Sequence, residues 1–195
     1  MRVNAAGSML RGGRTASGVL VHVEGHGTLN ESPALREFAV QSLQAQLGPS
    51  TVVVDLSRCD YLDSTFLGCL ASLHRKYNPT VPHRFLVAAS HDKSQRLLGP
   101  THLDQLLDVK DVCPELIGGT VDLTGPILST ADLGRHVMQC HRLLAELGDP
   151  GRRRSGRSPI SWPASSERLQ CAATRRRTSS KTTRDEVHNG RERKP

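Results

Sequence analysis

Hydrophobic residues recur at two different spacings along the first 150 residues of the chain. Short runs rich in valine, leucine and alanine are typical of buried strands, and they occupy residues 18–23, 51–54 and 84–89. Apolar residues at helical spacing follow each run and recur once more further on, which predicts four amphipathic helices over 32–47, 64–77, 90–98 and 129–147. Because strands and helices alternate, we expect an α/β fold with a mixed, largely parallel β-sheet packed with these helices.

A serine stands at the start of each predicted helix, at Ser32, Ser64, Ser90 and Ser129. Because a serine hydroxyl accepts a hydrogen bond from the free amides of a first helical turn, we expect Ser32, Ser64 and Ser129 to cap their helices. The segments between the regular elements are predicted as loops. They include a Gly-His-Gly turn at 25–27 and the stretch 57–63, whereas 112–123 is ambiguous between a short strand and loops.

Three regions of the chain differ in composition. Residues 1–17 contain glycine, serine and arginine without periodicity and are expected to form a flexible leader, and residues 18–149 form the predicted domain. Residues 150–195 mix basic and hydroxyl side chains with almost no apolar content. We expect this tail to be disordered, because a segment of this kind cannot offset the entropy lost on ordering.

The net charge of +7 is unevenly distributed. Residues 1–149 hold 13 basic and 15 acidic side chains, whereas residues 150–195 hold 13 basic and 4 acidic ones. The predicted domain is therefore slightly acidic, and the basic character belongs to the tail. Such a tail can bind polyanions non-specifically through electrostatic attraction.

Composition argues against several classes of protein. No apolar run approaches the ~20 residues that span a bilayer, and the first residues lack the apolar stretch of a secretory signal, so we expect no membrane insertion. The five cysteines form no Cys-x-x-Cys pair, which favours the reducing cytoplasm. Aromatic residues make up only 3% of the chain, too few for the stacking surface of a single-strand nucleic-acid binder.

The most informative segment is 51–70, in which a buried strand leads through a short loop into a helix that starts with Asp63, Ser64 and Thr65. The start of a helix presents unpaired amides at the positive end of the helix dipole. A phosphoryl group on Ser64 is tolerated there and adds about −1.5 to −2 charges to the surface. Ser64 is therefore either a simple cap or a phosphorylation site.

This segment resembles the STAS domains of the anti-sigma factor antagonist type. The resemblance rests on the buried strand, Asp55-Leu-Ser, a short spacer, then Asp63-Ser-Thr and an aliphatic helix that contains Gly68. It extends over the strand and helix order from about Gly18 to Gly148. It implies a STAS-like fold, with Ser64 as the phosphorylated serine.

The resemblance also implies a bacterial, cytoplasmic and non-enzymatic binding module that regulates transcription by partner switching. The unphosphorylated protein would bind an anti-sigma factor kinase and release its sigma factor, and a PP2C-type phosphatase would reset Ser64. The residues expected to flank the phosphate or to support partner docking are Asp63, Thr65, Phe66, Gly68 and Asp55. The family usually has a glycine where this chain has Phe66.

That departure favours an alternative, a constitutive STAS interaction subunit of a lipid-transport complex or a sensory scaffold. In this alternative Ser64 only caps its helix and no phosphorylation switch exists. Co-purification with transporter subunits instead of a kinase would support it.

Two groups of residues could indicate an enzyme or a metal site, but each lacks a feature that such a site needs. Asp55 stands at a strand end, where phosphoryl-accepting carboxylates occur, but Ser57 occupies the place of the second acid that a metal would need. His136 and Cys140 lie one helical turn apart beside His141, a spacing that suits metal ligands. Because Cys140 and His141 fall on the apolar stripe of the helix, we expect core packing there, and neither a cofactor nor a metal.

Overall fold

The computed structural model describes residues 9–44 and 51–148. In chain order the elements are β1 (Met9–Arg14), β2 (Gly18–Gly27), α1 (Ser32–Gln44), β3 (Thr51–Asp55), β4 (Cys59–Leu62), α2 (Ser64–Tyr77), β5 (Phe85–Ala88), α3 (His91–Leu97), the 3₁₀ turn η1 (Gly99–Thr101), β6 (Val109–Lys110), β7 (Thr120–Asp122) and α4 (Thr130–Gly148). Within these residues, none of the helices has the length and apolar character needed to cross a membrane.

The strands form one mixed sheet in the order β6-β5-β3-β2-β1-β7, and β4 pairs with the far end of β2. The pairs β2–β3, β2–β4, β3–β5 and β5–β6 are parallel. The strand β1 pairs antiparallel with both β2 and β7. The expected α/β class with a mixed, largely parallel sheet is therefore confirmed.

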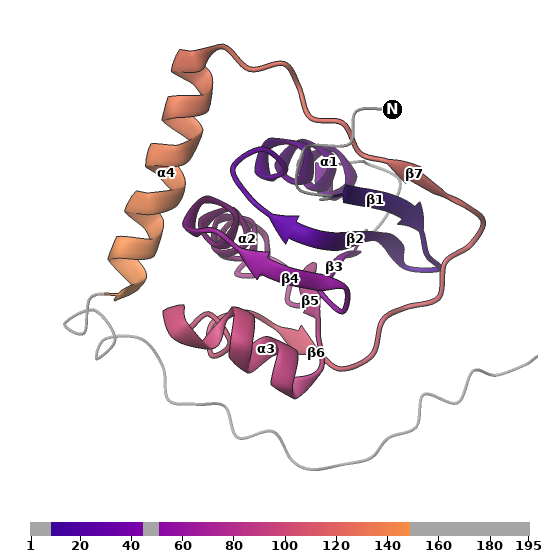
Figure 1. Ribbon diagram of the computed structural model, residues 1–195. Coiled ribbons are helices and arrows are strands. Elements are labelled where there is room, and N and C mark those ends of the chain that lie inside the picture. Colours follow the sequence, from indigo (N-terminus) through magenta and orange to yellow (C-terminus); the bar gives the residue numbers. More distant parts are fainter. Residues whose placement is uncertain (1–8, 45–50, 149–195) are drawn as a thin grey trace, which may run out of the picture. The chain divides into compact units, whose positions relative to one another are not determined.

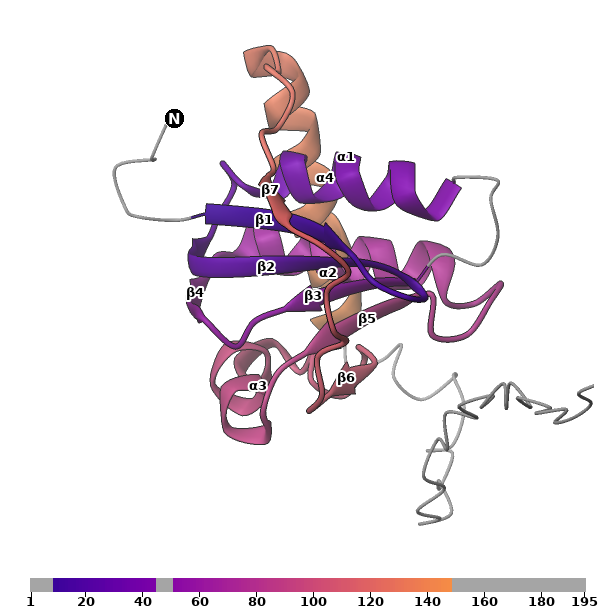
Figure 2. The same ribbon diagram turned by 90° about the vertical axis from the view of Figure 1, so that its right-hand side faces the viewer.

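The two faces of the sheet are covered differently. Helices α1, α2 and α3 pack on one face, α4 lies on the outer side of α2, and the segment between β6 and α4 crosses the opposite face (Figures 1 and 2). Successive side chains of β3 point to opposite faces of the sheet. Val52 and Val54 lie in the large core beneath the helices, whereas Val53 joins Leu20 and Ala88 in a small cluster on the other face.

The expected flexible leader is wrong for Met9–Arg14, which form β1 in the middle of the antiparallel half of the sheet. Leu10 is 3% exposed and belongs to the main core. Gly12 and Gly13 interrupt the run of apolar residues by which this strand could be recognised in the sequence, yet close packing favours glycine at both positions. A Cβ on Gly12 would come within 2.9 Å of the side chains of Leu123 and Phe38, so close packing favours glycine at this position.

The predicted turn at 25–27 is also wrong, because β2 continues to Gly27 and pairs with β4. The register shifts between Gly25 and His26, and Gly25 has a φ of 72°, a backbone conformation that favours glycine. The predicted loop at 57–63 accordingly contains the strand β4. Because the bulge requires a glycine at residue 25, the sequence Gly-His-Gly at 25–27 resembles that of a turn although it belongs to a strand.

Of the three predicted caps, the one at Ser129 is confirmed, because its hydroxyl accepts from the amide of Asp132 at the start of α4. Ser90, where the sequence predicts that a helix begins, caps α3 by accepting from the amide of Lys93. Ser32 and Ser64 are instead the first residues of α1 and α2. The predicted extension of the first helix to residue 47, the start of the leader (1–8) and the basic tail (150–195) lie outside the described residues.

Since β1 contributes to the core, Leu10→Ala should lower the free energy of unfolding by about 2–5 kcal/mol, the usual range for deletion of a buried leucine side chain. Arg14→Ala is the control on the same strand, because Arg14 is exposed and its removal should change stability by less than about 0.5 kcal/mol. Urea denaturation measures both. Equal, small effects would contradict the assignment of β1 to the core.

Candidate functional site

The start of α2 is held by the carboxylate of Asp63. One oxygen, Oδ1, accepts from the amide of Phe66 at 2.8 Å, and the other, Oδ2, accepts from the amide of Leu29 at 2.8 Å. The amide of Asp63 in turn donates to the carbonyl of Gly27 at 3.0 Å. Asp63 is therefore the N-cap of α2, and it also ties this helix to the loop that follows β2.

Because Asp63 caps the helix, the expectation that Ser64 is the cap is wrong. Ser64 is the first residue of α2, and it is exposed. Its Oγ lies 2.8 Å from Nε2 of His141 on α4. The hydroxyl is thus at the surface, beside an imidazole from a helix 77 residues further along the chain.

The helix α4 reaches Ser64 because it packs closely on α2 at Gly68. A Cβ on Gly68 would meet the carbonyl oxygen of Cys140 at 2.5 Å and its Cβ at 2.6 Å. Glycine is therefore required at this crossing by the approach of the second helix. Cys140 and Gly68 set the depth at which α4 lies, and this places the next residue, His141, over the first turn of α2.

A second serine–histidine pair joins α4 to α1. Ser32 Oγ lies 2.8 Å from Nε2 of His136, and Nδ1 of the same ring lies 3.4 Å from an Nη1 of Arg36. A guanidinium can only donate, so Nδ1 accepts and Nε2 carries the proton that is donated to Ser32. The hydroxyl of Ser32 then donates to the carbonyl of Leu29. Both ring nitrogens of His136 are thus fixed in a neutral tautomer.

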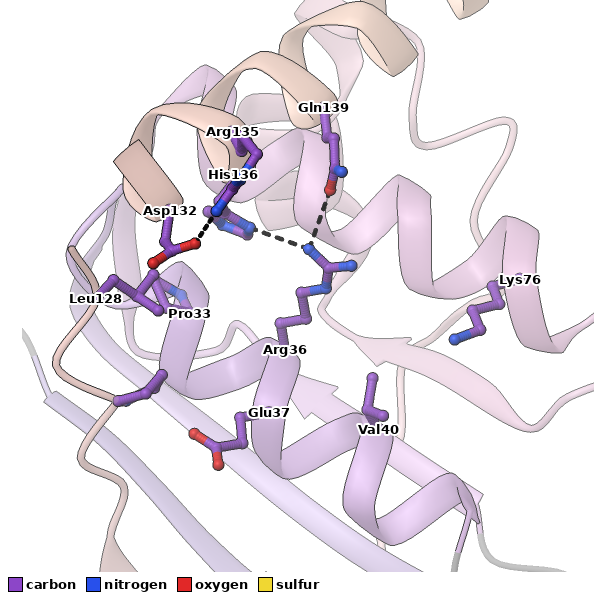
Figure 3. Close-up of a pocket in the computed structure, with 11 residues that line it drawn as sticks. Pro33, Arg36, Glu37, Val40, Lys76, Leu128, Asp132, Arg135, His136 and Gln139 are labelled. Carbon is purple, nitrogen blue, oxygen red and sulfur yellow. Dashed lines mark hydrogen bonds and ion pairs between the residues drawn. The ribbon is translucent and has the colours of Figure 1, made fainter. Parts of the chain in front are cut away.

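Burial and the neighbouring positive charge both act on His136. The side chain is 5% exposed, and desolvation followed by the charge of Arg36 lowers the pKa of its imidazole below the ordinary 6.5. Arg36 also donates to Oε1 of Gln139 and lines a cavity of about 480 Å³ between α1 and α4 (Figure 3). The contacts of His136 are structural, since they hold the start of α1 against α4.

The expectation of core packing for these α4 residues holds for His136 and Cys140 and is wrong for His141, which is exposed. Desolvation raises the pKa of the Cys140 thiol to about 11, which leaves it protonated at neutral pH. Within residues 9–44 and 51–148, no group of three or more His, Cys, Asp or Glu side chains is arranged to hold a metal ion.

Three of the residues expected to flank a phosphate are buried behind Ser64. Thr65 is 3% exposed, Phe66 is fully buried, and Gly68 lies under α4. Phe66 points into the core and packs near Gly27, where a Cβ on the glycine would come within about 3.0 Å of the ring. Phe66 therefore presents no side chain to a partner, and Asp63 and Ser64 remain as the accessible members of the motif.

Asp55 lies elsewhere. It alternates with Val54 on β3 and therefore faces the side of the sheet opposite the helices. Its Oδ2 lies 2.8 Å from Nδ1 of His22 and accepts from Oγ of Ser57, and its Oδ1 accepts from the amide of Ser57. The structure therefore separates Asp55 from Ser64, although the two residues lie in the same sequence motif. Asp55 fixes the turn that leads out of β3.

The chain is similar to known proteins over part of its length. Residues 11–81 match a family model described as "Mlab, STAS domain". The chain is also similar to a solved structure, "Crystal Structure of an Anti-sigma Factor Antagonist from Mycobacterium paratuberculosis", with 22% identity over 57% of this chain and 92% of that one and a TM-score of 0.46. A search of the curated proteins found no match. The family match runs from within β1 to just beyond the end of α2, and it therefore includes Ser64.

The α2–α4 crossing predicts opposite effects for two glycine substitutions. Gly68→Ala should destabilise the fold by about 1–3 kcal/mol, because the added methyl group meets the backbone of Cys140. Gly134→Ala, on an exposed part of α4 with no atom near the new Cβ, should stabilise it by about 0.5–1 kcal/mol. Thermal unfolding measures both. Similar shifts in the two variants would be inconsistent with a close crossing at Gly68.

The environment of His136 predicts a loss of stability in acid. Since its pKa is lower in the folded protein than the ordinary 6.5, the unfolded chain takes up the proton first as the pH falls. Stability is therefore full above about pH 6.5 and declines below it. In His136→Gln the unfolding free energy should depend less steeply on pH between about 7 and 5. His91→Gln, an exposed histidine on α3, should keep the wild-type slope.

Proposed function

We propose that this chain carries a STAS domain and acts as an anti-sigma factor antagonist that is switched by phosphorylation of Ser64. The unphosphorylated protein binds an anti-sigma factor kinase in the bacterial cytoplasm and thereby releases a sigma factor. Phosphorylation of Ser64 ends this binding, and a PP2C-type phosphatase restores it. The protein itself is a binding module in this scheme and regulates transcription without being an enzyme.

The observation that carries this function is the exposed hydroxyl of Ser64 at the first position of α2. Because Asp63 accepts the hydrogen bond of the capping amide, the fold of α2 does not depend on the Ser64 hydroxyl. A phosphoryl group can therefore be added and removed without unfolding the helix. This is the property that a reversible covalent switch requires.

The surface around Ser64 supports a change of partner. Two large hydrophobic side chains, Leu29 and Tyr61, are exposed, with 36% and 53% of their surfaces accessible. The amide of Leu29 donates to Asp63, and Tyr61 lies three residues before Ser64 in the chain. A phosphate adds about −1.5 to −2 charges beside the carboxylate of Asp63. The same patch is then apolar with one negative charge before phosphorylation and strongly anionic after it, which disfavours an apolar or acidic partner.

The burial of Phe66 bears on the constitutive alternative. That alternative drew its support from a bulky side chain in place of a glycine at the docking surface. Since Phe66 is 0% exposed and lies in the core, it leaves the surface around Ser64 unobstructed. Phosphorylation and docking at the start of α2 are therefore sterically compatible with this sequence.

A phosphorylation and binding experiment tests this function. Purified protein is incubated with ATP and each candidate anti-sigma kinase encoded by neighbouring genes, and phosphate is mapped by mass spectrometry. We expect phosphate on Ser64 in the wild type and in Ser57→Ala, a control that removes another exposed serine. Ser64→Ala should bind the kinase, and Ser64→Asp should bind at least about tenfold more weakly, a loss of about 1.4 kcal/mol.

Two results would count against the switch. One is the absence of phosphate on Ser64 with every kinase tried. The other is equal binding of the Ser64→Ala and Ser64→Asp variants to the kinase. Recovery of transporter subunits with the wild-type protein and with both variants alike would support the constitutive alternative.

A further inference from the structure

His141 gives Ser64 a neighbour that the motif around Ser64 does not contain. Nε2 of His141 lies 2.8 Å from Ser64 Oγ, within the distance at which a base takes a proton from a hydroxyl. The contact is made from a different helix, and the close crossing of Gly68 and Cys140 fixes its geometry. Both side chains are exposed, so a phosphoryl donor can approach the same hydroxyl.

The chemistry of phosphoryl transfer to a serine gives this contact a use. A serine hydroxyl is a weak nucleophile until a nearby base accepts its proton. An imidazole is the side chain best suited to this task near neutral pH, because its ordinary pKa lies close to it. With its own proton on Nδ1, a neutral His141 accepts from the Ser64 hydroxyl at Nε2.

We propose that His141 is the proton acceptor for phosphorylation of Ser64, a role that rests on the proposed function. Ser64 Oγ attacks the γ-phosphorus of the ATP held by the partner kinase, and the bond between that phosphorus and the leaving ADP oxygen breaks. The Ser64 proton passes to Nε2 of His141, which becomes an imidazolium. The new phosphate then lies beside a positive charge supplied by this chain.

The second serine–histidine pair shows why the geometry at Ser64 is distinctive. Ser32 and His136 lie at the same 2.8 Å distance, but Ser32 is fully buried and closed to a phosphoryl donor. Arg36 also forces Nδ1 of His136 to accept, so Nε2 carries a proton and cannot take another. The pair at Ser64 is exposed, and among the residues that the structure describes the polar contacts of His141 are those of Nε2 to the hydroxyls of Ser64 and Thr65.

The charged groups near His141 come from both helices. On α2 the carboxylate of Asp63 precedes Ser64, and its charge also acts on the neighbouring Cys140. On α4 the next residue, Arg142, is paired with Glu146 at 3.6 Å. The imidazolium formed after proton transfer therefore has Asp63 as a nearby counter-charge. Thr65 Oγ1, at 3.5 Å from Nε2, is a longer and largely buried contact, so Ser64 is the hydroxyl that His141 serves.

The test compares initial rates of phosphate incorporation at Ser64 for the full chain with its kinase and ATP, over pH 5.5 to 8.5. His141→Gln keeps a side chain that can contact the hydroxyl but cannot take up a proton, and Arg142→Ala is the matched control on the next residue of α4. We expect His141→Gln to lower kcat by roughly 10²-fold at pH 8, the lower end of the effect of a general base, with little change in KM for the protein. Arg142→Ala should behave as the wild type.

The pH profile separates proton transfer from a merely structural role. A protonated imidazole cannot accept a second proton, so the rate advantage of the wild type over His141→Gln should shrink towards one in acid. A ratio that is independent of pH, a loss confined to KM, or a rate equal to that of Arg142→Ala would overturn the role of His141 while leaving the switch at Ser64 intact. Absence of phosphate on wild-type Ser64 would overturn both. Thermal unfolding of each variant shows whether a loss of rate comes from a loss of fold.

Discussion

The carboxylate of Asp63 is the interaction on which the rest of the site depends. Its two oxygens accept hydrogen bonds from two amides, one in the first turn of α2 and one in the loop before α1. A buried or half-buried amide without a partner costs about 1–3 kcal/mol, so this carboxylate contributes to two segments of the fold at once. Because Asp63 takes the capping role, the neighbouring hydroxyl of Ser64 has no structural task in α2. An accessible and dispensable hydroxyl is what a modification site needs.

The position of α4 is the second constraint. This helix lies outside the layer formed by α1 and α2 (Figure 1), and it meets both of them through polar pairs at the start of each helix. The two pairs have the same residue types and the same length, but their environments give them different properties. Arg36 and burial hold His136 in one neutral form, whereas His141 is exposed and contacts an exposed hydroxyl. Of these two similar contacts on α4, the pair of Ser32 and His136 is structural, whereas the pair of Ser64 and His141 is accessible to a reactant.

Much of this fold could be predicted from the sequence, because the periodicity of apolar residues is set by elements that each bury one face. The four helices, β3, β5 and the cap at Ser129 follow that pattern. The strands β1 and β4 do not. Glycines in β1 leave room for side chains that come from distant segments, and the bulge at Gly25 interrupts the alternation of β2 where β4 pairs with it. Both strands are specified by close approach of neighbours, which a local pattern does not contain.

The candidate site shows the same division between local and distant information. Asp63 and Ser64 could be found from the motif, yet their roles at the start of the helix are exchanged relative to the expectation, because either side chain is chemically able to cap. Asp55 and Ser64 share a motif but lie on opposite faces of the sheet. Asp55 on β3 points away from the helices, whereas Ser64 begins α2, which packs on the other face. His141 had no signal in the sequence beyond its place on an amphipathic helix.

The charged groups next to Ser64 matter more for this site than the net charge of the chain does. Residues 150–195 carry a net charge of +9 and residues 1–149 a net charge of −2, whereas the groups beside the Ser64 hydroxyl are the carboxylate of Asp63 and the imidazole of His141. At such separations a unit charge acts with a strength of about 1–4 kcal/mol, depending on the local dielectric constant, and more distant exposed charges are screened by salt. The response of this surface therefore depends on whether α4 is seated on Gly68. In the proposed switch, a partner that binds α4 and a kinase that reaches Ser64 would act on the same contact between Ser64 and His141, so the last helix of the domain would be part of that switch.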